Sequence, residues 1–470
     1  MNFENNLYTG TVKYKEIQFQ FVLFNNELRL IPSSTEQEKI KYWFLKEISD
    51  GKFTFYFPKI GTDHLIGNCN ETGQKILFLM EQEDYIARRN TVLVLELTAY
   101  LKFKYDCESI GRISFQGPEI NCIYPIQNAS EIELDTTQLQ EFVEKGSVQI
   151  KIKDFESTTT KKQIFMLDNK EVNVYFSIRR GIGRKDDDSP IILNSTLILQ
   201  FESTSDVSFL FDLYKITRLF VQYLCNRRNI NLDLIELGSL QESGKYANVA
   251  TLCVFEHKDE SIKERKNEKY IRYECIKGHE GAILSAIASH QLYLRHLPNS
   301  FKSDHEMDAG DFVIITAAFE WEFKKIYPNG IPKSDQQIKA EQEAKNALEN
   351  LRRNSTSRLK NIYKHLEKLI GNDPLKNEIE RIGTDYDDII GKMGERLYLK
   401  NKENFCYSEI GDRLATQRNN FAHGNLDKNF IGLSLLDLVF LKRIIYVMQL
   451  DSCGVERKQI AKAITELFGF

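Results

Sequence analysis

The first two hundred residues of the chain alternate between apolar and polar positions. The stretch "TGTVKYKEIQFQFVLFNNELRLI" shows this best, with Asn25 and Asn26 interrupting it. Successive side chains of a β-strand point to opposite faces, so a period of two predicts strands with one buried face. The asparagine pair predicts a hairpin turn. The same kind of apolar and polar pattern continues in "TVLVLELTAYLKFKY", "SVQIKIKDF", "QIFMLDNKEVNVYFSIRR" and "PIILNSTLILQFE". We therefore predict a mostly antiparallel β region.

The period changes after residue 204. Ser205 and Asp206 can cap a helix, and apolar residues then recur at spacings of three and four: Phe209, Leu213, Ile216, Phe220 and Leu224. A second β-hairpin is predicted over 247–281, with a charged loop between its arms, and a helix over 282–297. The polar connector "PNSFKSDHEMDAGD" places a domain boundary near residue 300. The first region, 1–300, divides into two subdomains if the chain breaks near 200–245.

Beyond that boundary the pattern is helical. We expect helices over 311–327, 335–370, 408–427 and 431–448; Gly371 and Pro374 act as stop signals. The predicted fold class is α+β, with a β-rich region followed by an all-α four-helix bundle over 301–470.

Composition narrows the possible functions. The chain has 470 residues and a net charge of −4, so binding of nucleic acid requires a local basic patch. Its first ten residues, "MNFENNLYTG", lack a basic start and an apolar run, and we expect a cytoplasmic protein. The apolar run "FIGLSLLDLVFLKRIIYVMQL" is interrupted by Asp437, Lys442 and Arg443, which predicts a buried helix. The eight cysteines have no framework spacing, which indicates reduced thiols.

The segment "RNNFAH", residues 418–423, lies on the predicted helix over 408–427. A helical projection gathers Ile410, Leu414 and Phe421 into one core-facing stripe. Asn419 and His423, four residues apart, share the opposite face, and Arg418 lies on the flank. Two interpretations stay open: a solvated polar face, or a site that faces a substrate or a partner subunit.

"RNNFAH" on a late helix of such a bundle resembles the R-N-x-x-x-H signature of HEPN ribonucleases. The segment "AAFEWEF" resembles the A-x-E pattern that opens many HEPN domains. The order of a β-rich region and a helical domain is similar to that of ApeA-type abortive-infection proteins of bacterial phage defence. The motif covers six residues strongly and the helical domain loosely.

The resemblance implies a metal-independent endoribonuclease that needs no cofactor and leaves a 2′,3′-cyclic phosphate. His423 can exchange protons near neutral pH, and Arg418 offers a planar cation for phosphate oxygens. Asn419, one turn before His423, can orient the imidazole or donate to the phosphate. In HEPN enzymes two copies of the motif face each other across a dimer, so the resemblance also implies a homodimer.

Two further features fit RNA cleavage. Glu320, in "AAFEWEF", can pair with Arg418 and orient it; a surface ion pair is the alternative. The segment 345–368 is rich in cations that can guide an RNA backbone, although a solvated helix face is the alternative. The candidate RNA-binding residues in that segment are Arg352, Arg353, Arg358, Lys360 and Lys364.

Other motifs are weaker. Cys253 with His257, and Cys275 with His279, form two Cys/His pairs that can be considered for zinc. In the predicted hairpin the pairs lie too far apart along the strands for one ion, which favours buried cysteines with histidines at the rim. The segment "RRGIGRKDDDSP" lacks phosphate-loop spacing, which favours a solvated loop between strands.

Together these patterns predict a cytoplasmic anti-phage ribonuclease, with a β-rich sensor or regulatory region and a HEPN-type domain that cuts RNA. Transfer RNA is one candidate target, and a phage-derived molecule is a candidate trigger. The alternatives are a non-catalytic nucleic-acid-binding or dimerisation module, and a regulatory HEPN partner protein.

Overall fold

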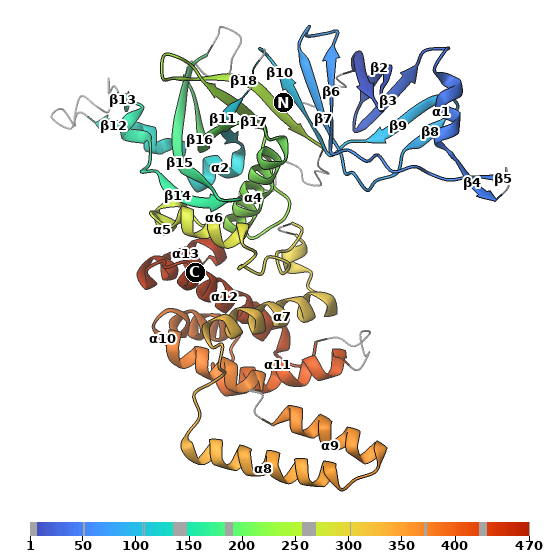
Figure 1. Ribbon diagram of the computed structural model, residues 1–470. Helices are drawn as coiled ribbons and strands as arrows, with labels where there is room; N and C mark the ends of the chain where they lie inside the picture. The colour runs from blue at the N-terminus through green and yellow to red at the C-terminus, as the bar shows by residue number, and fades with distance from the viewer. Residues whose placement is uncertain are drawn as a thin grey trace. The chain divides into compact units, whose positions relative to one another are not determined.

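The computed structural model of the chain confirms the α+β class: a large antiparallel sheet precedes an all-helical region (Figure 1). The structure describes residues 7–49, 52–105, 107, 109–134, 148–183, 191–255, 269–300, 302–370, 374–422 and 430–469. The chain forms two compact units, Met1–Val221 with Asn229–Lys263, and Gln222–Arg228 with Glu264–Phe470. Residues 269–300, predicted as part of the first region, thus group with the helices; whether the first region is one domain or two stays a prediction.

A 14-stranded antiparallel sheet dominates the first unit, in the order β14-β15-β16-β11-β17-β18-β10-β7-β6-β1-β2-β3-β9-β8 among the described residues. Its strands are β1 (Tyr8–Tyr14), β2 (Ile17–Phe24), β3 (Glu27–Pro32), β6 (His64–Cys69), β7 (Lys75–Leu79), β8 (Ala87–Arg89), β9 (Val92–Glu96), β10 (Ala99–Phe103), β11 (Ile110–Gln116), β14 (Gln163–Leu167), β15 (Lys170–Ile182), β16 (Ile191–Thr204), β17 (Leu234–Leu240) and β18 (Tyr246–Val254). Two smaller ribbons pair β4 (Leu45–Ser49) with β5 (Lys52–Phe55), and β12 (Ser130–Leu134) with β13 (Val148–Ile152).

The alternating sequence pattern becomes alternating burial. In β2, Ile17, Phe19, Phe21 and Leu23 are buried, whereas the residues between them face outward. The predicted turn after β2 is confirmed, because β2 pairs with β3 and Asn25 has a φ of 53°. An asparagine tolerates this left-handed conformation better than most residues do. The short helix α1 (Gln37–Trp43) adds Ile40 to the same core.

The predicted helix after residue 204 is α4 (Val207–Cys225), and its apolar stripe is buried. Phe209 packs edge-on against Phe201 of β16. The second predicted hairpin is wrong. Its first arm is β18, which pairs with β17 and β10; in its second arm Tyr273–Ile276 forms a short helix, α5. The helix predicted over 282–297 is shorter than expected, since α6 spans Glu280–Ala288. Another short helix, α2 (Pro118–Ile123), contacts β11 and β16.

The second unit contains a bundle of α7, α10, α11 and α12, in which α11 and α12 contact each other and both contact α7 and α10. The helices after residue 300 are α7 (Ala309–Ile326), α8 (Asp335–Arg353), α9 (Ser357–Leu369), α10 (Leu375–Lys400), α11 (Tyr407–Ala422), α12 (Ser434–Ser452) and α13 (Arg457–Phe468). The four helices that form this bundle are therefore not the four that were predicted. The helix predicted over 335–370 is two helices, α8 and α9, which pack on each other and break at Asn354; α10 takes its place.

Helix α12 is the predicted buried helix, and its side chains from Phe440 to Leu450 are all buried. Asp437 and Lys442, two of the charges that interrupt its apolar run, have internal partners. Asp437 binds Arg413, and Lys442 pairs with Asp304. Among the described residues, no helix combines the length and apolar character needed to cross a bilayer.

Candidate nuclease site

Helix α11 presents the two faces that its sequence predicts. Ile410, Leu414 and Phe421 are buried in the bundle, whereas Asn419 is exposed and Arg418 is half-exposed. The apolar stripe fixes the rotation of the helix about its axis, because turning it would expose these side chains. Arg418 and Asn419 consequently point away from the bundle core.

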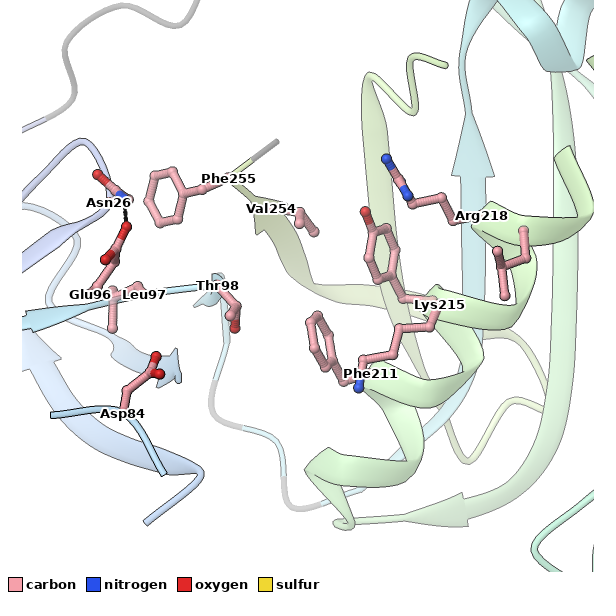
Figure 2. A pocket seen from close by; sticks show the side chains of 12 residues that line it. Asn26, Asp84, Glu96, Leu97, Thr98, Phe211, Lys215, Arg218, Val254 and Phe255 are labelled. Carbon is pink, nitrogen blue, oxygen red and sulfur yellow. Dashed lines mark hydrogen bonds between the residues drawn. The ribbon is translucent and has the colours of Figure 1, made fainter. Parts of the chain in front are cut away.

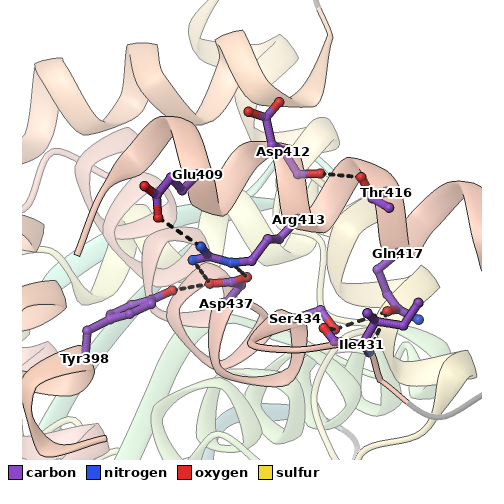
Figure 3. A network of polar contacts seen from close by, with 9 residues as sticks. All are labelled: Tyr398, Glu409, Asp412, Arg413, Thr416, Gln417, Ile431, Ser434 and Asp437. Atoms are coloured by element: carbon purple, nitrogen blue, oxygen red, sulfur yellow. Dashed lines mark hydrogen bonds and ion pairs between the residues drawn. The ribbon is translucent and has the colours of Figure 1, made fainter. Parts of the chain in front are cut away.

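A buried ion pair fixes α11 against α12. The Asp437 carboxylate, fully buried, accepts hydrogen bonds from Arg413 Nε at 2.7 Å and Nη2 at 2.8 Å (Figure 3). The hydroxyl of Tyr398 on α10 donates to the same carboxylate. Hydrogen bonding to Asp437 raises the pKa of Arg413, and burial, together with this carboxylate, raises the pKa of Tyr398. A bidentate pair compensates a buried charge well, so three helices are fixed at one point.

The chain is also anchored on both sides of residues 423–429, which lie outside the described part. Gln417 Oε1 accepts hydrogen bonds from Ile431 N at 2.9 Å and from Ser434 Oγ at 3.1 Å (Figure 3). The Phe421 ring packs edge-on against Phe430, with centroids 5.8 Å apart. The last described turn of α11 is thus tied to the start of the segment leading into α12.

Arg418 pairs with Glu320 of α7. Its Nη1 and Nη2 groups donate to the two carboxylate oxygens, and the Nη2–Oε2 distance is 3.2 Å. The pair expected from the sequence is therefore present; its role in catalysis stays a prediction. The fork restricts the guanidinium to one plane. The Arg418 side chain keeps 43% of its surface exposed, so it remains accessible to a phosphate.

The structure assembles part of the predicted motif. Arg418 and Asn419 are adjacent on α11, with Glu320 facing Arg418 from the neighbouring helix. His423 directly follows Ala422, the last residue of α11, and lies outside the described residues. The described residues of the site thus hold an oriented cation beside an exposed amide.

Comparison with known proteins gives no match. No family model, no curated protein and no solved structure matches this chain.

The predicted RNA-binding residues form two groups: two arginines that pair with glutamates, and three cations that are exposed on α9. Arg352 pairs with Glu367 at 2.8 Å, and Arg353 with Glu349 at 2.6 Å. By contrast Arg358, Lys360 and Lys364 are exposed on α9, and no ion pair joins them to another described residue. A phosphate backbone would meet these three cations without displacing a carboxylate.

The candidate zinc residues do not form a metal cluster in the described part of the chain. No group of three or more potential ligands occurs there, and His257 lies outside it. Cys253 belongs to β18 of the first unit, whereas Cys275 and His279 belong to the second. Burial raises the pKa of Cys275 to about 12, and its thiol contacts Glu466 at 3.4 Å. Since the second arm of the predicted hairpin is helical, the cross-strand distance argument does not apply.

Sequence reasoning missed the residues that position the site. Tyr398, Arg413 and Asp437 hold α11 in place, yet none was predicted to have this role. The usable signal was Asp437 itself, because a carboxylate inside an apolar helical run requires a partner. The sequence does not identify that partner, since Arg413 is 24 residues away.

Proposed function

We propose that the helical unit is a HEPN-type endoribonuclease that cuts RNA without a metal ion, through Arg418, Asn419 and His423. The observation that carries this proposal is the fork between Glu320 and Arg418, with the exposed Asn419 beside it. A charged side chain that only serves solubility does not need a partner on a second helix to hold it in place. A cation held in one plane, with part of its surface free, suits the recognition of a phosphate.

The chemistry follows from the substrate. RNA carries its own nucleophile, the 2′-hydroxyl, so cleavage needs a base for its proton, an acid for the departing 5′-oxygen and positive charge at the phosphorus. His423 transfers protons, Arg418 stabilises the charge on the phosphate oxygens, and Asn419 orients the imidazole or donates to the phosphate. The products are a 2′,3′-cyclic phosphate and a 5′-hydroxyl.

One motif supplies one histidine and one arginine, whereas the reaction needs both a base and an acid. We therefore propose that two chains combine their motifs in a homodimer. The exposure of Asn419 and the half-exposure of Arg418 leave both side chains accessible to a second chain.

The exposed cations of α9 would contribute to RNA binding. Arg358, Lys360 and Lys364 provide positive charge that attracts a phosphate backbone regardless of its sequence. Transfer RNA remains one candidate substrate.

The biological role is part of the same proposal. An unrestrained ribonuclease would destroy the RNA of its own cell, so its activity requires control. We assign sensing or restraint to the β-rich unit, with a phage-derived trigger, in the cytoplasm of a cell that uses abortive infection.

Purified protein tests the activity. Wild type, Arg418→Ala and His423→Ala would be incubated with total RNA and with tRNA, and the product ends would be analysed. We expect 2′,3′-cyclic phosphate ends from the wild type only. Arg396→Ala removes an exposed arginine of α10 and serves as the control that keeps activity.

Measurements of RNA binding distinguish the ribonuclease from the alternative, a non-catalytic binding module. If the three proteins bind RNA equally and none cuts it, even in extracts of phage-infected cells that supply a trigger, the enzyme proposal fails and the binding-module interpretation replaces it. Retained binding with lost cleavage in His423→Ala supports the enzyme.

A further inference from the structure

The first unit contains a cavity of about 640 Å³ that the nuclease proposal does not use. One wall comes from the loops at the end of β2 and after β9, and the other from α4 (Figure 2). Val254 and Phe255, at the end of β18, lie between them. The volume falls within the range of sites for small ligands.

Flat aromatic surfaces line part of this cavity. Phe211 and Tyr214 of α4 stack with centroids 5.6 Å apart and an angle of 16° between their planes. Phe255 adds a third ring, which packs against Tyr100. Phe211 and Phe255 are only partly buried, so each keeps ring surface available to a ligand. Such rings bind planar groups through stacking.

The wall formed by α4 is cationic. Lys215 and Arg218 line it one turn apart, and Lys215 Nζ lies 4.7 Å from the centre of the Phe211 ring. Lys215 also contacts Asp212 at 3.3 Å, in a pair whose side chains are about half exposed. Exposed pairs of this kind are weak, so a ligand anion can compete for the ammonium group.

The opposite wall is rich in acceptors. Asp84 and Glu96 present carboxylates, and Asn26 Nδ2 donates to Glu96 Oε1 at 2.9 Å, which holds that carboxylate in place (Figure 2). These groups attract N–H and O–H donors and repel anions. An anionic group would therefore fit only at the α4 side of the cavity, and a ligand would need donors at the other side.

We propose that this cavity is a nucleotide-binding site. The phosphate contacts Lys215 and Arg218, the base stacks on Phe211 or Phe255, and amino or hydroxyl groups of the base or ribose donate to Glu96 and Asp84. A free amino acid fits less well, because its ammonium and carboxylate groups are attached to one carbon, whereas a nucleotide separates its phosphate from the N–H donors of a flat base. The proposal does not depend on ribonuclease activity.

Calorimetric titration of the full chain tests the proposal. The probes are AMP, GMP, CMP and UMP at up to millimolar concentration, with the matching nucleosides and ribose 5-phosphate as partial ligands. We expect saturable binding of at least one monophosphate. Its nucleoside and ribose 5-phosphate should each bind about tenfold more weakly or worse, because each lacks one of the two recognised parts. The proposal is overturned if no monophosphate binds, or if either partial ligand binds as tightly as the nucleotide.

Variants locate the site. Lys215→Gln should weaken the bound nucleotide by about tenfold, while Lys215→Arg retains most of the affinity. Lys41→Gln is the matched control: it removes a similarly exposed lysine that also pairs with an acid three residues earlier, on α1 and outside the cavity lining. Equal losses in both Gln variants, or no loss in Lys215→Gln with the fold intact by thermal unfolding, would contradict the assignment.

Discussion

Glu320 on α7 accepts hydrogen bonds from both terminal nitrogens of Arg418 on α11, across 98 residues of sequence. The contact joins two helices of the bundle at the point where the R-N-x-x-x-H segment begins. A carboxylate in this position orients the guanidinium before any phosphate arrives. Catalytic groups held in advance lose less entropy when the substrate binds.

Replacing Glu320 by Gln should reduce the rate of RNA cleavage more than RNA binding. Glutamine keeps only one acceptor oxygen, and its NH2 group cannot accept, so the two-oxygen fork is lost and Arg418 is no longer held in one plane. The half-exposed pair contributes only about 0–1 kcal/mol to stability, and the free energy of unfolding should change little. Single-turnover cleavage, RNA affinity and urea unfolding measure the three quantities.

Asp388→Asn is the matched control for this variant, because Asp388 of α10 also pairs with an arginine of another helix, Arg457 of α13, on the protein surface. It should cleave RNA as the wild type does. A Glu320→Gln enzyme that keeps the full cleavage rate would show that the fork is only a surface ion pair.

Removing the buried carboxylate in Asp437→Ala should destabilise the protein by about 3–5 kcal/mol, since Arg413 and Tyr398 lose their shared partner inside the bundle. Chemical denaturation measures this. The exposed Asp412, which pairs with Lys376 at 2.7 Å, gives the comparison: Asp412→Ala should cost far less, because exposed pairs contribute little to stability. Similar losses in the two variants would refute the anchoring role of Asp437.

The stability of the protein should fall in mild acid because of His296. Burial, aided by the charge of Lys442, lowers the pKa of this histidine from 6.5 to about 3. At a pH between these two pKa values, His296 is protonated in the unfolded chain but not in the folded chain. The stability that comes from keeping His296 neutral is therefore fully present above about pH 6.5. It decreases as the pH falls towards 3, by at most about 1.4 kcal/mol per pH unit.

Urea unfolding of His296→Phe from about pH 7 to pH 4 tests this origin, since a phenyl ring keeps the contact with Tyr446 and cannot titrate. Its free energy of unfolding should change less with pH than that of the wild type. The control His365→Ala removes an exposed imidazole on α9 and should keep the wild-type slope. Identical slopes for all three proteins would exclude His296 as the cause.

Exchanging Arg358, Lys360 and Lys364 together for Gln should weaken RNA binding without regard to sequence. The salt dependence of binding should also decrease, by about 0.7 in logarithmic slope for each lost phosphate contact. Fluorescence anisotropy at several salt concentrations measures both. Lys392→Gln with Lys402→Gln removes exposed lysines outside α9 and should have little effect; an equal effect would indicate general charge attraction instead of a site on α9.

Sequence patterns predicted the strands and helices that bury only one of their faces. The strand pair around Asn25 and the core stripe of α11 followed directly from periods of two and 3.6. The partner of Arg418 could be proposed because Glu320 lies in a recognisable segment of the first bundle helix. These features are local, or depend on one residue in a distinct motif.

The missed elements depend on tertiary contacts. Helix α10 contains glycines that weaken a helix signal, and the structure explains two of them. A Cβ on Gly383 would lie 2.6 Å from the Tyr407 ring, and one on Gly394 would lie 2.3 Å from the Phe405 ring. Similarly, the alternating residues near Ile271 look like a strand, but the Ile271 amide donates to Leu224 O and the residue is buried there instead.

The central claim is tested most directly by sequencing total RNA with capture of 2′,3′-cyclic phosphate ends. Cells expressing the wild type or His423→Ala would be compared with and without phage challenge, with both proteins present at equal levels. We expect new cyclic-phosphate ends on defined RNAs in challenged wild-type cells, and none with His423→Ala. Identical end profiles in the two challenged strains would contradict it, and "RNNFAH" would then be a solvated helix face.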